Sequence, residues 1–484
     1  MTTFRTLAAF GALGGATLIA AVMSAAPEKP IASGEMEFFD DMTGCFSNES
    51  VAAIVDEGTD PAIAAQVYNM ILKQFEEQQS NSRYFVSSRW PVGSIGNPVN
   101  VTYSFPADGI TMDAGAGNPN VLHADLTGTF LTEAAWKDLF RQVFDRWEEI
   151  TGNTYTEVSD DNAFWGASGP IHGGSGRGDI RLWSRRIDGA SNVLAFNFFP
   201  GSGVGGDMVL DSGENWGGGA AQNFRFFRNV VAHENGHGMG LRHVCTDTGH
   251  RALMNPFLST TFDGPQHDDI RGMQRQYGDF NEPNGNIATA TDLGFFNPLD
   301  SASVFGASVS GSEDDYYGVT VSGSSLLDVT VSPVGVSYNN GPQAGDGSCP
   351  LGPVIDTLAL HDLRVRVLNA AGGEIANVNA NPAGLPEFVV DATLGSGGTF
   401  YVVVDSLDTF VTETQLYNIS VNVTIPLPDG DLNSDCIVDT ADLGGLIGAF
   451  GGSGPFGDIN GDGVVDTADL GILISNFGAT CTGM

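Results

Sequence analysis

The stretch VVAHENGHGMGLRHV, Val230–Val244, holds three of the eight histidines that the 484-residue chain contains. On a helix, residues four apart share a face, so His233 and His237 can direct their imidazoles at one point. Gly240 permits a left-handed turn that ends the helix, so that His243 approaches the same point from outside the helical spacing. The stretch therefore predicts a helix that carries a metal site with three nitrogen ligands.

Zinc favours tetrahedral nitrogen ligation, and a site with three protein ligands keeps a fourth position for water, whose pKa falls to about 7. Glu234 follows the first histidine, so it lies off the ligand face but within reach of that water. We expect Glu234 to be the general base for attack on a peptide carbonyl. Each histidine alone could be an ordinary hydrogen-bonded residue, but the complete string is too specific for that reading.

The string HENGHGMGLRH resembles the zinc signature of the metzincin metallopeptidases, and Met254 in ALMNPF resembles the methionine of the turn beneath their zinc. Within that clan the similarity is to the matrixins, over about residues 97–278. The resemblance implies a secreted zinc endopeptidase that hydrolyses extracellular proteins, with an α+β catalytic domain of a mixed twisted sheet and long helices. Met254 and Gly240 then have structural roles, and an extended substrate pairs along the edge strand Val193–Phe196.

The stretch IDGASNVLAFNFFPGSGVGGDMVLDSGENW is similar to the edge strand and calcium loop of the matrixins. By that resemblance Asp188, Asp211 and Glu214 bind a structural calcium ion, and Asp207 is a candidate for a second ion. Carboxylates around a glycine-rich loop are also the hard oxygen donors that calcium prefers. The alternative is a solvated acidic loop without an ion.

Several positions depart from the matrixin pattern. Matrixins carry a second zinc on histidines whose positions correspond to Phe196 and Val209 here, so we expect one zinc ion. Val244 replaces the serine that commonly follows the third histidine. No Pro-Arg-Cys-Gly segment precedes the domain; Cys45 could bind the zinc as a thiolate, or could be a disulfide partner or a free thiol.

The N-terminus has Arg5, an apolar run over residues 7–23 and small residues at 24–26, the order of a signal peptide over residues 1–26. A membrane anchor is the alternative, but the run is short and interrupted by glycines. Residues 27–95, with a helical stretch at Ala62–Glu77, are expected to be a pro-segment or N-terminal extension. The net charge of −38 disfavours nucleic acid and anionic membranes as partners and favours bound cations.

The peptidase domain is expected over residues 96–280, with an amphipathic helix after the N-cap Thr132 that ends at Gly152. Its apolar face comprises Trp136, Leu139, Phe140, Val143, Phe144, Trp147 and Ile150. Residues 281–427 have short alternating runs between turn formers, which predicts an all-β sandwich. The sandwich resembles the prepeptidase C-terminal domain; an unrelated sandwich spacer is the alternative.

Residues 428–484 contain two copies of one unit, beginning at Asp431 and Asp458. Oxygen-bearing residues at positions 1, 3, 5, 9 and 12 of each copy predict calcium loops, each followed by a helix, in a small α-helical module. Position 6 is Gly463 in the second copy but Cys436 in the first, which favours weaker binding there. The ligands expected are Asp431, Asn433, Asp435, Asp439 and Asp442, and Asp458, Asn460, Asp462, Asp466 and Asp469.

The repeats resemble a type I dockerin, which implies a cohesin-like partner; a calcium-stapled terminal knob without a partner is the alternative. Among the five cysteines, Cys436 and Cys481 lie in this module and are the expected pair. For the whole chain, the alternative to a peptidase is a calcium-dependent adhesion or scaffold protein with a non-catalytic metzincin-like domain. Such a protein would be expected to have lost Glu234 or a metal ligand, and all four residues are present.

Overall fold

The protein is described by a computed structural model covering residues 51–56, 59, 86, 88–91, 93–112, 119–167, 172–174, 176–201, 203–247, 252–297, 299–311, 313–344, 346–408 and 413–481. The expected signal peptide, Cys45 and the helical stretch at Ala62–Glu77 lie outside these residues. The chain divides into two compact units, one of Met1–Tyr277 with Tyr338–Ile355, the other of Gly278–Ser337 with Asp356–Met484.

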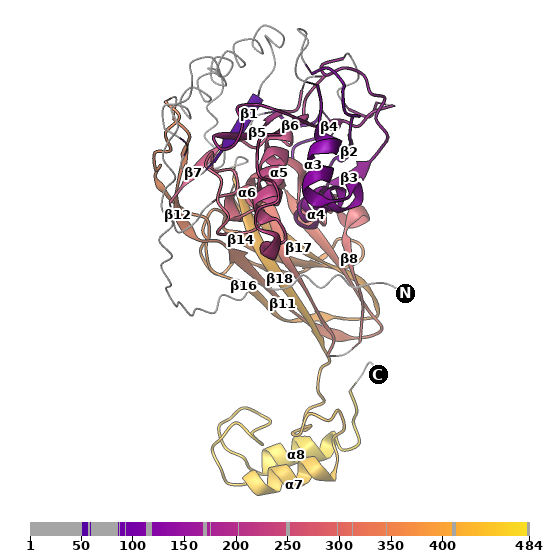
Figure 1. Ribbon diagram of the computed structural model, residues 1–484. Helices are drawn as coiled ribbons and strands as arrows, with labels where there is room; N and C mark the ends of the chain where they lie inside the picture. Colours follow the sequence, from indigo (N-terminus) through magenta and orange to yellow (C-terminus); the bar gives the residue numbers. More distant parts are fainter. Residues whose placement is uncertain are drawn as a thin grey trace. The chain divides into compact units, whose positions relative to one another are not determined.

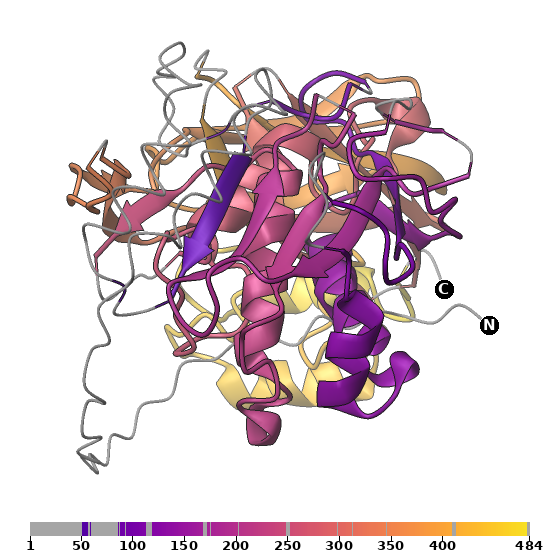
Figure 2. The ribbon, with the colours of Figure 1, turned by 45° about the horizontal axis from the view of Figure 1, so that its top comes forward.

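The first unit is built on a six-stranded mixed sheet with the strand order β1-β5-β6-β4-β2-β3 (Figure 1). β5 runs antiparallel to both of its neighbours, whereas β6, β4, β2 and β3 pair in parallel. Figure 2 shows β1 beside β5 at one end of the sheet. The strands are β1 (Val51–Val55), β2 (Asn100–Ser104), β3 (Thr154–Glu157), β4 (Ile180–Arg185), β5 (Val193–Phe198) and β6 (Met208–Asp211).

Within the described residues of this unit lie the helices α3 (Leu122–Phe130), α4 (Glu133–Ile150), α5 (Arg225–Gly238) and α6 (His267–Tyr277). α4 confirms the predicted amphipathic helix, because Thr132 caps its start and all seven predicted apolar residues are buried. The helix ends at Ile150 with Thr151 as its C-cap, so the predicted stop Gly152 is the residue directly after the cap. α5 carries the histidine string, and its residues from Asn229 to Gly238 are buried.

Residues 338–355 interrupt the second unit in sequence but belong to the first unit in space. We call residues 338–355 the arm. Within the arm, β12 (Ser337–Pro342) pairs antiparallel with β7 (Val244–Thr246), the strand that follows the third histidine. β13 (Val354–Asp356) completes a three-stranded sheet. A disulfide between Cys245 and Cys349 closes this arrangement across 104 residues of sequence. No sequence pattern predicts the arm.

The second unit contains the two antiparallel-rich sheets expected from the alternating runs, with strand orders β15-β14-β17-β10-β8 and β16-β11-β18-β9. Inward-facing residues of both sheets form one apolar cluster that includes Val319, Val329, Val365 and Val421. The strands are β8 (Thr291–Phe296), β9 (Ser301–Ser310), β10 (Asp314–Val321), β11 (Ser325–Val334), β14 (Leu363–Leu368), β15 (Glu374–Val378), β16 (Glu387–Leu394), β17 (Gly398–Ser406) and β18 (Thr414–Thr424).

The C-terminal repeats form two short helices, α7 (Thr440–Ala449) and α8 (Thr467–Ser475), each capped by the aspartate at loop position 9. Val438 and Leu446 of the first copy pack with the equivalent Val465 and Leu473 of the second in a small core. The predicted disulfide between Cys436 and Cys481 is confirmed. Among the described residues no helix has both the length and the apolar character needed to cross a membrane.

Candidate metal centre

The three predicted histidine ligands meet at one point. His233 Nε2 lies 2.9 Å from His237 Nε2 and 3.2 Å from His243 Nε2, and the remaining pair is 3.1 Å apart. Nitrogens that share a tetrahedral zinc ion with bonds of about 2.05 Å are separated by roughly 3.3 Å. The triad therefore has the spacing of a zinc site, with slightly shorter separations.

The Nδ1 contacts of His233 and His237 determine which nitrogen of each imidazole carries the proton. His233 Nδ1 contacts Leu253 O and His237 Nδ1 contacts Leu241 O, both at 2.7 Å. A carbonyl oxygen can only accept, so each Nδ1 donates and each Nε2 presents a bare lone pair. Burial lowers the pKa of both imidazoles well below its ordinary value, so both are neutral. Converging lone pairs repel one another unless a cation lies between them, and this donor set fits zinc.

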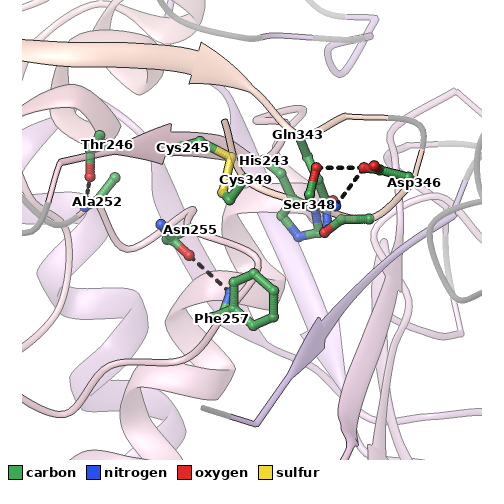
Figure 3. The surroundings of a disulfide bond; sticks show 11 residues. His243, Cys245, Thr246, Ala252, Asn255, Phe257, Gln343, Asp346, Ser348 and Cys349 are labelled. Carbon is green, nitrogen blue, oxygen red and sulfur yellow. Dashed lines mark hydrogen bonds between the residues drawn. A yellow bond between two sulfur atoms is a disulfide. The ribbon is translucent and has the colours of Figure 1, made fainter. Parts of the chain in front are cut away.

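The third imidazole is held by the arm rather than by a backbone carbonyl. Gln343 Oε1 accepts a hydrogen bond from His243 Nδ1 at 2.8 Å, while Gln343 Nε2 donates to Gly347 O at 3.0 Å. Because the amide nitrogen is committed to a carbonyl, the amide oxygen must face the ring. Figure 3 shows Gln343 beside His243, close to the disulfide between Cys245 and Cys349. Burial lowers the pKa of His243 to about 4, so this ring is neutral too.

Glu234 is fully buried beside the triad, on the same helix. Its Oε1 accepts a hydrogen bond from the backbone nitrogen of Ile54 at 3.2 Å. Its Oε2 is a buried atom without a hydrogen-bond partner. Burial raises the pKa of Glu234 well above its ordinary value. A carboxylate with one uncommitted oxygen in a dry site is suited to exchanging a proton with a reacting water.

The two residues given structural roles support the triad. Gly240 has the predicted left-handed conformation, with φ of 99°. Gly236 lies directly on Met254, because a Cβ at that position would overlap the methionine sulfur. Asp269 of α6 holds the methionine turn by accepting hydrogen bonds from Leu253 N at 2.7 Å and Met254 N at 3.0 Å. The turn and the helix are thus fixed against each other.

Comparison with known proteins agrees with this geometry. Residues 122–278 match the Matrixin family model. Matrixins are zinc metalloendopeptidases that use catalytic zinc and structural calcium. We refer to residues 122–278 as the matrixin segment.

The chain is similar to bovine (Bos taurus) interstitial collagenase, with 37% identity over 166 residues that cover 33% of this chain and 32% of the collagenase. It is also similar to matrix metalloproteinase-18 of Xenopus laevis, with 36% identity over 161 residues that cover 32% of this chain and 31% of that protein. The chain therefore spans about a third of the length of these curated relatives.

Among solved structures, the pre-peptidase C-terminal domain of collagenase from Bacillus anthracis covers 27% of this chain and 95% of its own. Its sequence identity is 12% and its TM-score is 0.17.

In the matrixin segment, β5 does not offer the free edge that we predicted for substrate. β5 lies between β6 and β1, and β1 comes from the expected N-terminal extension. β5 is therefore not an edge strand in this structure, because residues 51–55 pair with it. The pairing of a substrate along Val193–Phe196 stays a prediction. Sequence periodicity could not reveal this, since five residues of apolar sequence do not specify a partner strand so far along the chain.

The predicted calcium ligands of the matrixin segment surround the loop that connects β4 and β5. Asp211 accepts hydrogen bonds from the backbone nitrogens of Asp188 and Gly189, and Glu214 accepts one from Ser191. Burial raises the pKa of Asp188 to about 7, with the charge of Asp211 adding to the effect, and burial raises that of Glu214 to about 7. Asp188 Oδ1 is buried without a hydrogen-bond partner. An orphaned carboxylate oxygen in an acidic loop fits a cation.

Asp207, the candidate for a second ion, has both carboxylate oxygens in hydrogen bonds. They accept from Arg181 N at 2.9 Å and from Trp183 Nε1 at 3.4 Å. This aspartate joins β4 to the start of β6 and has a structural role of its own.

We expect calcium to stabilise the matrixin segment through Asp188. Calcium at about 100 times its dissociation constant should stabilise the fold by about 2.7 kcal/mol and raise the melting temperature by roughly 5 to 10 °C. Asp188→Asn should lose most of this increase, whereas Asp138→Asn, whose side chain is 60% exposed on α4, should keep it. Differential scanning calorimetry with and without calcium measures the shift. An equal calcium response in both variants would remove Asp188 from the site.

The two C-terminal loops have equivalent hydrogen bonds. The position-1 aspartates, Asp431 and Asp458, accept from the backbone at positions 5 and 6 of their own loops. The position-12 aspartates, Asp442 and Asp469, accept from the backbone at positions 2, 3 and 9. In the first loop, ligand oxygens of Asp431, Asp435 and Asp442 lie within 4.8 Å of one another. The first loop thus gathers oxygens as a calcium site requires.

Position 6 has the same left-handed turn in both loops, with φ of 69° at Cys436 and 90° at Gly463. A residue with a Cβ is strained there, and the disulfide to Cys481 holds Cys436 in place. The first loop therefore forms the predicted turn at a cost that the second avoids.

Proposed function

We propose that this chain is a secreted, zinc-dependent endopeptidase that hydrolyses peptide bonds of extracellular proteins, with Glu234 as general base. The observation that carries the proposal is the convergence of three Nε2 atoms within 3.2 Å, beside a buried carboxylate. A zinc ion bound there would polarise the attacking water and the substrate carbonyl.

The residues of the chain supply the rest of the chemistry. His233, His237 and His243 hold the metal as neutral ligands. Glu234 takes the proton from water and delivers it to the nitrogen of the leaving amine. Its hydrogen bond to the Ile54 nitrogen supports this second role, because that contact places a peptide nitrogen within the carboxylate's reach.

Secretion is supported by the signal-like N-terminus and by the two disulfides, which form in oxidising compartments. The adhesion or scaffold alternative requires a site that has lost a catalytic group, whereas the triad and Glu234 are all present.

We propose further that the C-terminal repeats bind calcium and attach the chain to a cohesin-like partner. Ile447 and Ile474 occupy equivalent positions in the two copies and are 62% and 58% exposed. Phe450 and Phe477 form a second exposed pair. Such symmetry of exposed apolar residues favours a docking face over a terminal knob without a partner.

The proposal is tested by metal analysis and proteolysis of the purified full-length chain. We expect one equivalent of zinc in the triad and clearing of casein that is lost on zinc removal and restored by zinc. A protein that binds zinc and calcium but cuts no polypeptide would favour the scaffold alternative.

A further inference from the structure

Strand β1 occupies the place where a substrate would lie. Its residues pair antiparallel with β5, with Ala53 opposite Phe196 and Ile54 opposite Ala195. On its other side, Val55 N donates to Pro256 O and Val55 O accepts from Leu258 N, both at 3.1 Å. A single extended strand is thus held by backbone bonds on both sides, as in strand-addition recognition of peptides.

The side chains of Ala53, Ile54 and Val55 alternate as the strand geometry requires. Ile54 is fully buried and belongs to the apolar cluster that contains Val231 and Leu253. Ala53 and Val55 are also buried, in the separate cluster that contains Phe196. The side chain of Ile54 is therefore packed in the core of the first unit.

One peptide bond of β1 reaches the catalytic carboxylate. The nitrogen of Ile54, which donates to Glu234 Oε1, is the amide nitrogen of the Ala53–Ile54 bond. In peptide hydrolysis the general base must afterwards protonate the nitrogen of the cleaved bond. Glu234 contacts this nitrogen, so the contact identifies which bond of the segment is presented for cleavage.

We propose that residues 51–55 are an internal substrate of the peptidase site, cleaved between Ala53 and Ile54, and that they fill the groove until the cut is made. This inference rests on the proposed endopeptidase function. Water adds to the carbonyl carbon of Ala53, the carbon–nitrogen bond to Ile54 breaks, and the proton passes to the Ile54 nitrogen. The products are a carboxylate at Ala53 and a new amino terminus at Ile54.

The cut divides the bonds that hold the strand. Residues 51–53 keep their pairing with residues 196–198. Ile54 and Val55 keep their pairing with Ala195 and Val193, and Val55 also keeps its bonds to Pro256 and Leu258. Each half is then held by fewer backbone bonds than the intact strand, and its loss from the groove no longer requires the other half to leave. Cleavage therefore opens the groove to other polypeptides.

The test uses the full-length chain with zinc and calcium, and compares the wild type with Glu234→Gln by N-terminal sequencing and intact-mass spectrometry. We expect the wild type to begin at Ile54 and the variant to retain the Ala53–Ile54 bond. In the uncut variant, hydrogen–deuterium exchange should show protection of the Ile54 and Val55 amides, a readout that does not depend on activity.

A matched pair of substitutions tests the recognition of the segment. Ile54→Asp places a charge in a buried apolar site and should slow cleavage of this bond by on the order of 100-fold. Ile95→Asp makes the same change at a residue that is 54% exposed, and its chain should be cut as the wild type is. A synthetic peptide NESVAAIVDEGT, residues 48–59, should be cut at the same bond by the processed wild type.

The outcomes separate this inference from the proposed function. If casein is cut while Ala53–Ile54 stays intact in the wild type, the internal-substrate proposal is overturned and the endopeptidase stands. Cleavage of this bond in Glu234→Gln would also overturn it, because another protease would then be responsible. If neither casein nor the chain itself is cut, the proposed function fails together with the inference.

Discussion

Replacing Glu234 by glutamine should abolish measurable proteolysis, with kcat/KM falling by about 10²- to 10⁴-fold. Glutamine has the shape of glutamate but cannot take a proton from water or return one to the leaving amine. Glu234 is not among the three converging nitrogen ligands, so zinc content should be unchanged. Cleavage of a fluorogenic peptide and metal analysis of the same samples provide the two measurements.

A second comparison separates loss of the base from a blocked groove. If β1 stays uncut in Glu234→Gln, this variant lacks the general base and its groove also stays filled by β1. Either cause would account for its inactivity. Adding Ile54→Asp should displace the strand, so Ile54→Asp alone should cut the peptide while the double variant should not. Glu149→Gln, at a half-exposed glutamate on α4, is the matched control and should keep full activity. Activity in the double variant would contradict the assignment of the base.

Local patterns predicted the parts of the site that lie close together in sequence. The spacing of His233 and His237 predicts one helix face, and Gly240 predicts the turn that brings His243 back to that face. All of these residues lie within eleven positions, and the structure brings the three imidazoles together. The apolar face of α4 and the two repeated loops were equally predictable, because helical periodicity and internal repetition are short-range signals.

The parts that sequence reasoning missed depend on pairing between distant segments. β1 joins β5 across about 140 residues, and its sequence VAAIV is too short to specify a partner. The arm joins β7 from about 100 residues away, and its run SYNNGPQAGDGSCP reads as a loop because glycine, proline and polar residues dominate it. Five cysteines allow many pairings, so the Cys245–Cys349 bond could not be derived from their positions.

The arm bears directly on the metal centre, because its register with β7 leads to the third ligand. Pro342 pairs with Val244, so the next residue, Gln343, comes opposite His243. The disulfide Cys245–Cys349 ties β7, at a position two residues from that ligand, to the part of the arm that follows β12. Gln343 is therefore a positioning residue: it holds the imidazole of His243 with its Nε2 toward the other two histidines.

Gln343→Leu should weaken zinc binding by about 10- to 100-fold, the usual cost of removing a hydrogen-bond partner of a metal ligand. Leucine fills a similar volume but cannot accept from His243 Nδ1, so the ring loses its fixed tautomer and orientation. Competition with a chelator of known affinity measures zinc binding, and the visible spectrum of the cobalt-substituted protein reports the ligand geometry without depending on activity.

The controls distinguish positioning from general damage to the arm. Gln343→Glu keeps an acceptor oxygen for His243 and should retain most of the zinc affinity. Ser348→Ala removes a hydroxyl that bonds only within the arm, to Asp346, and should leave zinc affinity unchanged. If Gln343→Leu bound zinc as tightly as the wild type, or if Ser348→Ala lost affinity equally, the contact with His243 would not position the ligand. The arm would then stabilise the first unit through the pairing of β12 and through its disulfide alone, since those interactions do not require Gln343.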